Sequence, residues 1–129
     1  MLYLFLLGRI LLGGYFVMSG WNHFQHLAAN TGYAQSKGLP MPKAAVILSG
    51  IMMLLGGLGI LLGVYVEISV ALIVLFLLGT LLKMHRYWEV TEPMARMGEH
   101  INFWKNVGLL GAILMLLAIP TPWAWSLVY

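Results

Sequence analysis

Residues 44–64 read AAVILSGIMMLLGGLGILLGV and residues 66–82 read VEISVALIVLFLLGTLL, so two apolar runs follow each other with almost no break. A run of about 20 apolar residues is long enough to cross the hydrocarbon core of a bilayer as a helix. The break between the two runs is so short that it predicts an antiparallel helical hairpin. Two further apolar runs occupy residues 2–21 and 103–119. The sequence therefore predicts one domain of four spanning helices, at about 2–21, 44–64, 66–84 and 103–119.

The composition supports a protein that lies in a membrane. Hydrophobic residues make up 61% of the chain and charged residues 9%, whereas a soluble domain carries about 25% charged residues. The runs do not alternate apolar and polar residues, as strands of a membrane barrel would. The expected fold is all-α: an antiparallel, membrane-spanning four-helix bundle. The absence of cysteine excludes disulfides and thiolate metal sites within the chain.

Two polar connections separate the runs. In the first, residues 22–42, a short interfacial helix is possible at 23–37, before two prolines that interrupt regular helix. The second covers residues 85–102. After the fourth run, Trp123, Trp125 and Tyr129 are expected to form an aromatic anchor at the membrane surface.

The positive charges predict the orientation of the chain. Cytoplasmic ends of membrane spans carry an excess of Lys and Arg. All but one of the seven basic residues flank the two long connections: Lys37, Lys43, Lys83, Arg86, Arg96 and Lys105. We therefore expect cytoplasmic connections and external termini, in a prokaryotic inner membrane. These scattered charges form no basic stripe, which argues against nucleic acid as a partner. The first run lacks a basic start and a cleavage site, so we expect a retained helix.

Arg9 is the one basic residue deep inside a run, since Lys105 lies at the start of the fourth run. A charge in a membrane helix costs at least about 2.5–3.5 kcal/mol on insertion scales and usually faces the bundle interior. Arg9 could bind an anionic headgroup or a polar ligand, extend toward the near surface, or bond to Glu67. Gly13, Phe16 and His23 follow it at helical spacing, so this stripe lines a cleft or forms an ordinary inward face.

Four histidines belong to the same end of the predicted bundle: His23, His26, His85 and His100. Two of them, at positions 23 and 26, have the spacing that places two ligands on one helix face, which suits a metal or haem. Interfacial histidines that bond to backbone, water or lipid are the simpler interpretation. No metal-binding signature strengthens the first interpretation, so we expect no metal site and regard haem as a minor alternative.

Asn102 and Asn106 are four residues apart and share one face of the fourth run, beside Lys105. Buried amides commonly join membrane helices by hydrogen bonds. Together with a histidine they could also hold a carbonyl-bearing ligand such as a quinone ring in an apolar cleft. No carboxylate lies in the interior of the four runs, since Glu67 is only the second residue of the third run. This argues against an ion-coupled transporter. We predict no catalytic residue, and the candidate cofactor-binding residues are Arg9, His23, His85, Asn102 and Asn106.

Several short motifs, in order along the chain, resemble the DoxX family of small four-helix membrane proteins. They are GRILL at 8–12 leading to SGW at 19–21, KGLP at 37–40, GGLGILLG at 56–63, His85 after the third run, and NFWKN at 102–106. The resemblance covers nearly the whole chain. It implies the four-helix fold, and it implies a link to quinone-linked redox chemistry, as in thiosulfate:quinone oxidoreductase.

One position departs from the pattern that the resemblance implies. Members of that family often carry an acid in the second helix, where this chain has IMML at residues 51–54. Met53 is expected at the depth of Arg9, so the usual partner of the arginine is absent. This favours an accessory protein of a membrane redox complex that contacts quinone or lipid. The alternative is a purely structural subunit that packs against other membrane subunits, or against copies of itself, without catalysis.

Overall fold

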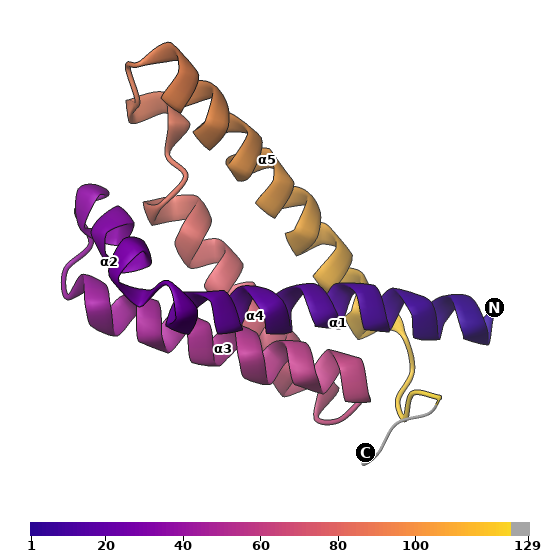
Figure 1. Ribbon diagram of the computed structural model, residues 1–129. Helices are drawn as coiled ribbons and strands as arrows, with labels where there is room; N and C mark the ends of the chain where they lie inside the picture. The colour runs from indigo at the N-terminus through magenta and orange to yellow at the C-terminus, as the bar shows by residue number, and fades with distance from the viewer. Residues whose placement is uncertain (125–129) are drawn as a thin grey trace.

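The computed structural model describes residues 1–124, and within them every regular element is helical (Figure 1). The four long helices are α1 (Leu2–Gln25), α3 (Pro42–Leu62), α4 (Val66–Lys83) and α5 (Pro93–Met115). The shorter elements are α2 (Leu27–Ser36) and the 3-10 turns η1 (Tyr87–Glu89) and η2 (Leu116–Ala118). The four long helices are each long and apolar enough to cross a membrane. The prediction of an all-helical, membrane-spanning fold is confirmed.

The short helix that was predicted in the first connection is present as α2. The backbone of His26, with φ −117° and ψ 43°, separates it from α1. Beyond α2, Gly38 adopts a φ of 77°, a left-handed conformation that glycine accepts without steric cost. The chain then reverses into α3, whose first residue is Pro42. Proline suits this first helical position because its missing N–H would have no helical partner there.

α1 and α3 pack closely because glycines lie on their facing sides. A Cβ added at Gly13 would lie 2.8 Å from the carbonyl oxygen of Gly57, and one added at Gly20 would lie 2.8 Å from that of Gly50. In a bilayer no hydrophobic driving force brings helices together, so close packing of their backbones stabilises the contact instead. These pairs fix the register and place Arg9 opposite the end of α3. The expectation that Met53 lies opposite Arg9 is therefore wrong, by about 12 Å along the helix.

The other long helices add to this pair one after another. α3 and α4 form the predicted antiparallel hairpin, with Gly63 and Tyr65 in left-handed conformations at the turn. Their contact surface holds fully buried residues such as Ile60 and Ile73. α5 packs against α4 and, within residues 1–124, makes no backbone contact with α1 or α3. Figure 1 shows α5 inclined to α1, with the two helices diverging toward the end of the molecule that holds α2.

α5 begins ten residues before the predicted start of the fourth helix. Glu92 caps it, since its carboxylate accepts hydrogen bonds from the backbone N–H groups of Met94 (3.1 Å) and Ala95 (2.6 Å). Pro93 takes the first helical position. Hydropathy missed these turns because they are polar. As a result Glu99 lies on a spanning helix, and the expectation that the spans hold no carboxylate is wrong.

The chain beyond η2 folds back onto the bundle. Trp123 is 3% exposed and packs edge-on against Phe5, with ring centroids 5.1 Å apart. The predicted role of Trp123 as a surface anchor is therefore wrong, because its ring lies in the core. The other two residues of that predicted anchor, Trp125 and Tyr129, lie outside the described residues.

Candidate binding site

Arg9 lies at the end of α3 and away from the other predicted site residues. It is 2% exposed. Its guanidinium donates to the carbonyl oxygens of Ile60 (3.3 Å) and Leu61 (3.2 Å), and also to that of Ala124. The last carbonyls of a helix have no helical partner and carry the negative end of its dipole. Arg9 thus caps α3, and these carbonyls take the place of an acid.

Two aromatic rings complete the surroundings of Arg9. The guanidinium carbon lies 5.6 Å from the ring centre of Phe5 and 5.4 Å from that of Trp123. Cations are attracted to aromatic faces at such distances, most strongly where water is absent. Glu67, the other partner considered for Arg9, makes no ion pair within residues 1–124. His23 lies about 21 Å further along α1, so Arg9 and the histidine do not form one site.

Three of the predicted site residues meet around a cavity of about 440 Å³ between α1, α4 and α5, which we call the α1–α5 cavity. They are His23, His85 and Asn106. Asn22 and Lys105 add polar groups to its lining, while Phe16, Met53, Leu77 and Leu109 contribute apolar surface. The volume falls within the range of about 300–1,000 Å³ that ligand pockets occupy.

Hydrogen bonds fix two of these side chains. His23 Nδ1 lies 2.9 Å from the carbonyl oxygen of Ser19. A carbonyl can only accept, so Nδ1 carries the hydrogen and Nε2 is left as an acceptor in the neutral ring. Asn106, which is 6% exposed, donates from Nδ2 to Thr80 Oγ1 at 3.2 Å. Thr80 in turn donates to the carbonyl oxygen of Leu77 at 2.9 Å.

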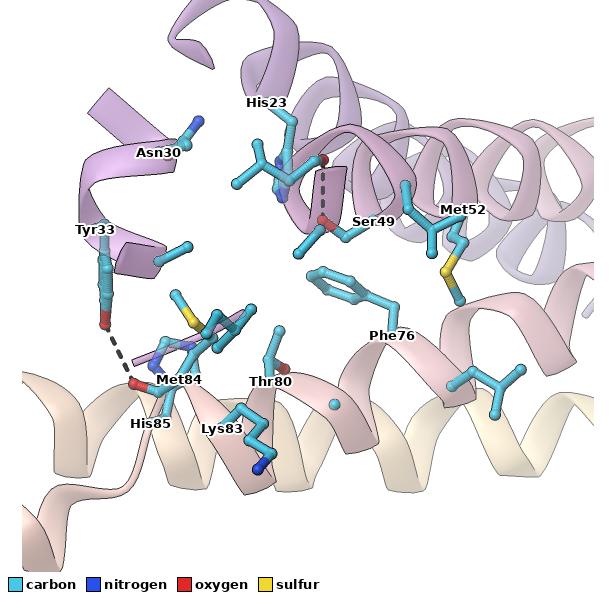
Figure 2. A pocket seen from close by; sticks show the side chains of 17 residues that line it. His23, Asn30, Tyr33, Ser49, Met52, Phe76, Thr80, Lys83, Met84 and His85 are labelled. Carbon is cyan, nitrogen blue, oxygen red and sulfur yellow. Dashed lines mark hydrogen bonds between the residues drawn. The ribbon is translucent and has the colours of Figure 1, made fainter. Parts of the chain in front are cut away.

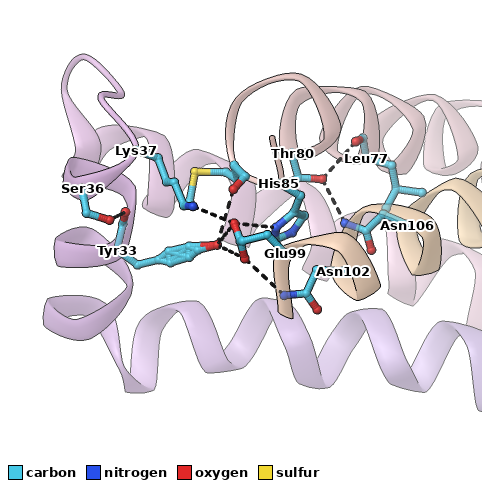
Figure 3. A network of polar contacts seen from close by, with 10 residues as sticks. Tyr33, Ser36, Lys37, Leu77, Thr80, His85, Glu99, Asn102 and Asn106 are labelled. Carbon is cyan, nitrogen blue, oxygen red and sulfur yellow. Dashed lines mark hydrogen bonds and ion pairs between the residues drawn. The ribbon is translucent and has the colours of Figure 1, made fainter. Parts of the chain in front are cut away.

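Glu99 is the centre of a polar network that the sequence did not predict (Figure 3). The hydroxyl of Tyr33, on α2, lies 2.7 Å from both carboxylate oxygens of Glu99. Lys37 Nζ lies 2.8 Å from Oε2, and Asn102 Nδ2 donates to Oε1 at 3.5 Å. Glu99 is 9% exposed. These contacts join α2 to α5, and they satisfy the charge of a carboxylate that water barely reaches.

The network perturbs Tyr33, which lies outside the spanning helices. Burial first, and then the hydrogen bond to the carboxylate of Glu99 and its charge, raise the pKa of Tyr33 far above its usual range. Tyr33 therefore remains a neutral hydrogen-bond donor at any physiological pH. The ring centre of Tyr33 lies 5.4 Å from Nζ of Lys37. The lysine therefore contacts both this aromatic ring and the carboxylate of Glu99.

His85 connects the network to the α1–α5 cavity. Its Nδ1 lies 3.6 Å from Glu99 Oε2, beyond hydrogen-bond distance. This nitrogen is buried and has no hydrogen-bond partner within residues 1–124. His85 also lines a second cavity, described below. It is thus the one predicted site residue that contacts both the buried charge pair and the cavities.

The remaining predicted residues fall outside the α1–α5 cavity. Asn102 bonds to Glu99 instead. His26 directly follows the last residue of α1, is exposed and does not line the cavity. His100 packs edge-on against Tyr87, with ring centroids 4.5 Å apart. Across residues 1–124, no three His, Cys, Asp or Glu side chains gather as a metal site would require.

One signal in the sequence could have identified the network. Glu99, Asn102 and Asn106 recur at steps of three and four, which places them on one helix face. That pattern becomes visible only when the helix is started at Glu92-Pro93, a capping residue followed by the proline of a first turn. The partners Tyr33 and Lys37 come from a separate helix, and no local pattern links them to Glu99.

Comparison with known proteins agrees with this architecture. The family model described as DoxX matches residues 4–86, which include all but the first two residues of α1, the whole of α2 to α4, and His85. The protein called inner membrane protein YphA, from Escherichia coli strain K12, is 36% identical over 124 residues, 96% of this chain and 87% of the relative. No solved structure matches. With four apolar spanning helices and a family match over more than half of its length, this integral membrane protein belongs to the DoxX family.

Proposed function

We propose that this protein is an accessory subunit of a membrane redox complex and that it holds the ring of a quinone in the α1–α5 cavity. The proposal rests on the composition of that cavity, in which His85, Lys105 and Asn106 lie together with apolar residues of α1 and α4. A quinone ring offers two carbonyl acceptors on an apolar, flat body. A few hydrogen-bond donors in an apolar pocket suit such a ligand.

Access to the cavity supports a ligand that arrives from the membrane. The two helices on either side of the cavity, α1 and α5, make no backbone contact within the described residues. A molecule dissolved in the bilayer can therefore enter between them without separating packed helices. We place the polar end of this cavity on the cytoplasmic side, since the basic residues gather at that end. The relative from Escherichia coli is named an inner membrane protein, and we propose the same membrane here.

The test uses the purified protein in lipid nanodiscs and a short-chain ubiquinone analogue, with binding followed by quenching of tryptophan fluorescence. His85→Leu and Asn106→Leu should each weaken binding about three- to tenfold, the loss expected for one hydrogen bond of about 0.5–1.5 kcal/mol. His100→Leu is the matched control, because His100 lines neither cavity. Equal quenching of the wild type and of all three variants would refute the quinone proposal.

The lack of backbone contact between α1 and α5 within the described residues also favours a second candidate, a structural subunit without a ligand. A helix of another membrane protein could occupy the open side of α5, since bundle faces with small residues such as Gly108 and Gly111 permit close packing. Gentle extraction followed by mass spectrometry distinguishes the two. A stoichiometric complex without quinone would support the structural subunit, and co-purified quinone would support the binding protein.

A further inference from the structure

A second cavity of about 400 Å³ lies between α2, α3 and α4, and we call it the α2–α4 cavity (Figure 2). Its lining is chiefly apolar, with Leu39, Val46, Met52 and Phe76 among the residues that form it. His23, Phe76, Thr80 and His85 line this cavity and the α1–α5 cavity alike. The two cavities are therefore neighbours that share these four side chains and differ in the rest of their linings.

The entrance of the α2–α4 cavity faces the hydrocarbon region. Leu48 of α3 and Leu75 of α4 both line it, and they are 60% and 61% exposed. Both residues lie well inside spanning helices, where the surroundings are lipid chains and not water. An apolar cavity with this entrance is accessible to a lipid chain.

The other end of the cavity is polar and lies at the level of α2. Figure 2 shows Tyr33, Met84 and His85 near one another at this end. Lys83 on α4 also belongs to the lining, and its nitrogen points outward from the cavity in this view. Tyr33 is already bonded to Glu99. No carboxylate within residues 1–124 forms an ion pair with Lys83.

The acids of this end of the molecule are all engaged elsewhere. Glu89 pairs with Arg86 at 2.6 Å, Glu99 pairs with Lys37, and Glu92 caps α5. Lys83 therefore offers an unmatched positive charge at the rim of an apolar cavity. Lysine side chains near helix ends extend into the headgroup layer, where they attract anionic lipids.

We propose that the α2–α4 cavity is a binding site for an anionic phospholipid of the surrounding bilayer. One acyl chain enters between Leu48 and Leu75 and lies against Met52 and Phe76. The phosphate lies at the rim beside Lys83. α2 closes the end of the cavity through Asn30, Tyr33 and Ala34, and its link to Glu99 holds it in place. This site is separate from the quinone site proposed above.

Gly79 offers a direct test of the chain position. It lines the cavity, and a Cβ added there would meet no atom within 4 Å, so Gly79→Phe adds a ring without a backbone clash. Gly108→Phe on α5 is the matched control, because its Cβ also meets nothing and Gly108 lines neither cavity. Native mass spectrometry of protein extracted from phosphatidylglycerol nanodiscs would count retained lipids. We expect Gly79→Phe to lose one lipid that the wild type and Gly108→Phe keep. Equal retention by all three would overturn the site.

Lys83 tests the headgroup. In competition between phosphatidylglycerol and phosphatidylcholine, Lys83→Gln should reduce the preference for the anionic lipid about fivefold, the effect of one basic residue near the surface. Lys43→Gln is the control, since Lys43 is exposed at the same end and lines neither cavity. A preference that is unchanged in Lys83→Gln, or reduced equally in both variants, would overturn the assignment of the phosphate to Lys83. Quinone quenching should persist in Gly79→Phe, which separates this proposal from the previous one.

Discussion

The hydroxyl of Tyr33 lies 2.7 Å from both carboxylate oxygens of Glu99, although the two residues are 66 positions apart in the chain. This contact and the neighbouring ion pair of Lys37 join the interfacial helix α2 to the spanning helix α5. The two helices make no backbone contact within the described residues. The connection between α2 and α5 therefore depends on side chains alone, so single substitutions can break it.

Removing the hydroxyl of Tyr33 should destabilise the protein. A hydrogen bond to a charged group contributes about 1.5–3 kcal/mol, so we expect Tyr33→Phe to lower the free energy of unfolding by about 2 kcal/mol. Unfolding in mixed micelles with increasing dodecyl sulfate measures this. Tyr87→Phe is the control, because the hydroxyl of Tyr87 has no hydrogen bond within residues 1–124. Equal losses in the two variants would show that the contact with Glu99 contributes nothing specific.

Glu99 should matter more than any other acid of the chain. Glu99→Gln removes the charge that faces Lys37, whose side chain is only 23% exposed, and we expect a loss of about 2–3 kcal/mol. Glu67→Gln, at an exposed first turn of α4, should cost less than about 1 kcal/mol. In the Glu99→Gln background, Tyr33→Phe should cost less than it does alone, because the two residues share one interaction. Strictly additive losses in this double-mutant cycle would contradict the network.

Arg9 should behave as a structural residue. Arg9→Leu leaves the terminal carbonyls of α3 without donors in an apolar region, and we expect a loss of about 3 kcal/mol. Arg9→Lys should recover only part of it, because an ammonium cannot present the planar set of donors. Arg96→Leu, at an exposed position of α5, is the control. If Arg9→Leu abolished quinone binding while its free energy of unfolding stayed at the wild-type value, Arg9 would belong to a ligand site instead.

The glycines between α1 and α3 provide a pair of neighbouring positions with opposite expectations. An alanine Cβ at Gly13 would lie 2.8 Å from Gly57 O and 2.9 Å from Leu61 N, whereas one at Gly14 would meet nothing within 4 Å. We expect Gly13→Ala to cost about 1–3 kcal/mol through forced separation of the helices. Gly14→Ala should stabilise slightly, by up to about 1 kcal/mol, because alanine favours helix. The same unfolding assay would contradict this packing if both substitutions were neutral.

Hydropathy alone was sufficient to predict the four spanning helices, since bilayer thickness fixes the length of an apolar run. It could not place the start of α5, whose first turns are polar and contain Glu99. The predicted order of the helices also correctly placed His23, His85 and Asn106 at one end of the bundle, because antiparallel helices of similar length bring alternate connections together. The partners of Arg9 were not predictable from residue types. They are backbone carbonyls, which every residue has, and only the register of α1 on α3 selects Ile60 and Leu61.

The orientation in the membrane can be tested by labelling single introduced cysteines, because the chain has no cysteine of its own that would react. The basic residues predict a cytoplasmic position for α2 and an external position for the turn between α3 and α4. Single cysteines at Ser36 and Glu67, both exposed, report on the two ends. A membrane-impermeant maleimide should label Glu67→Cys in intact cells, and should label Ser36→Cys only after permeabilisation. The reverse pattern would show that the termini are cytoplasmic, and would move the Lys83 site to the outer leaflet.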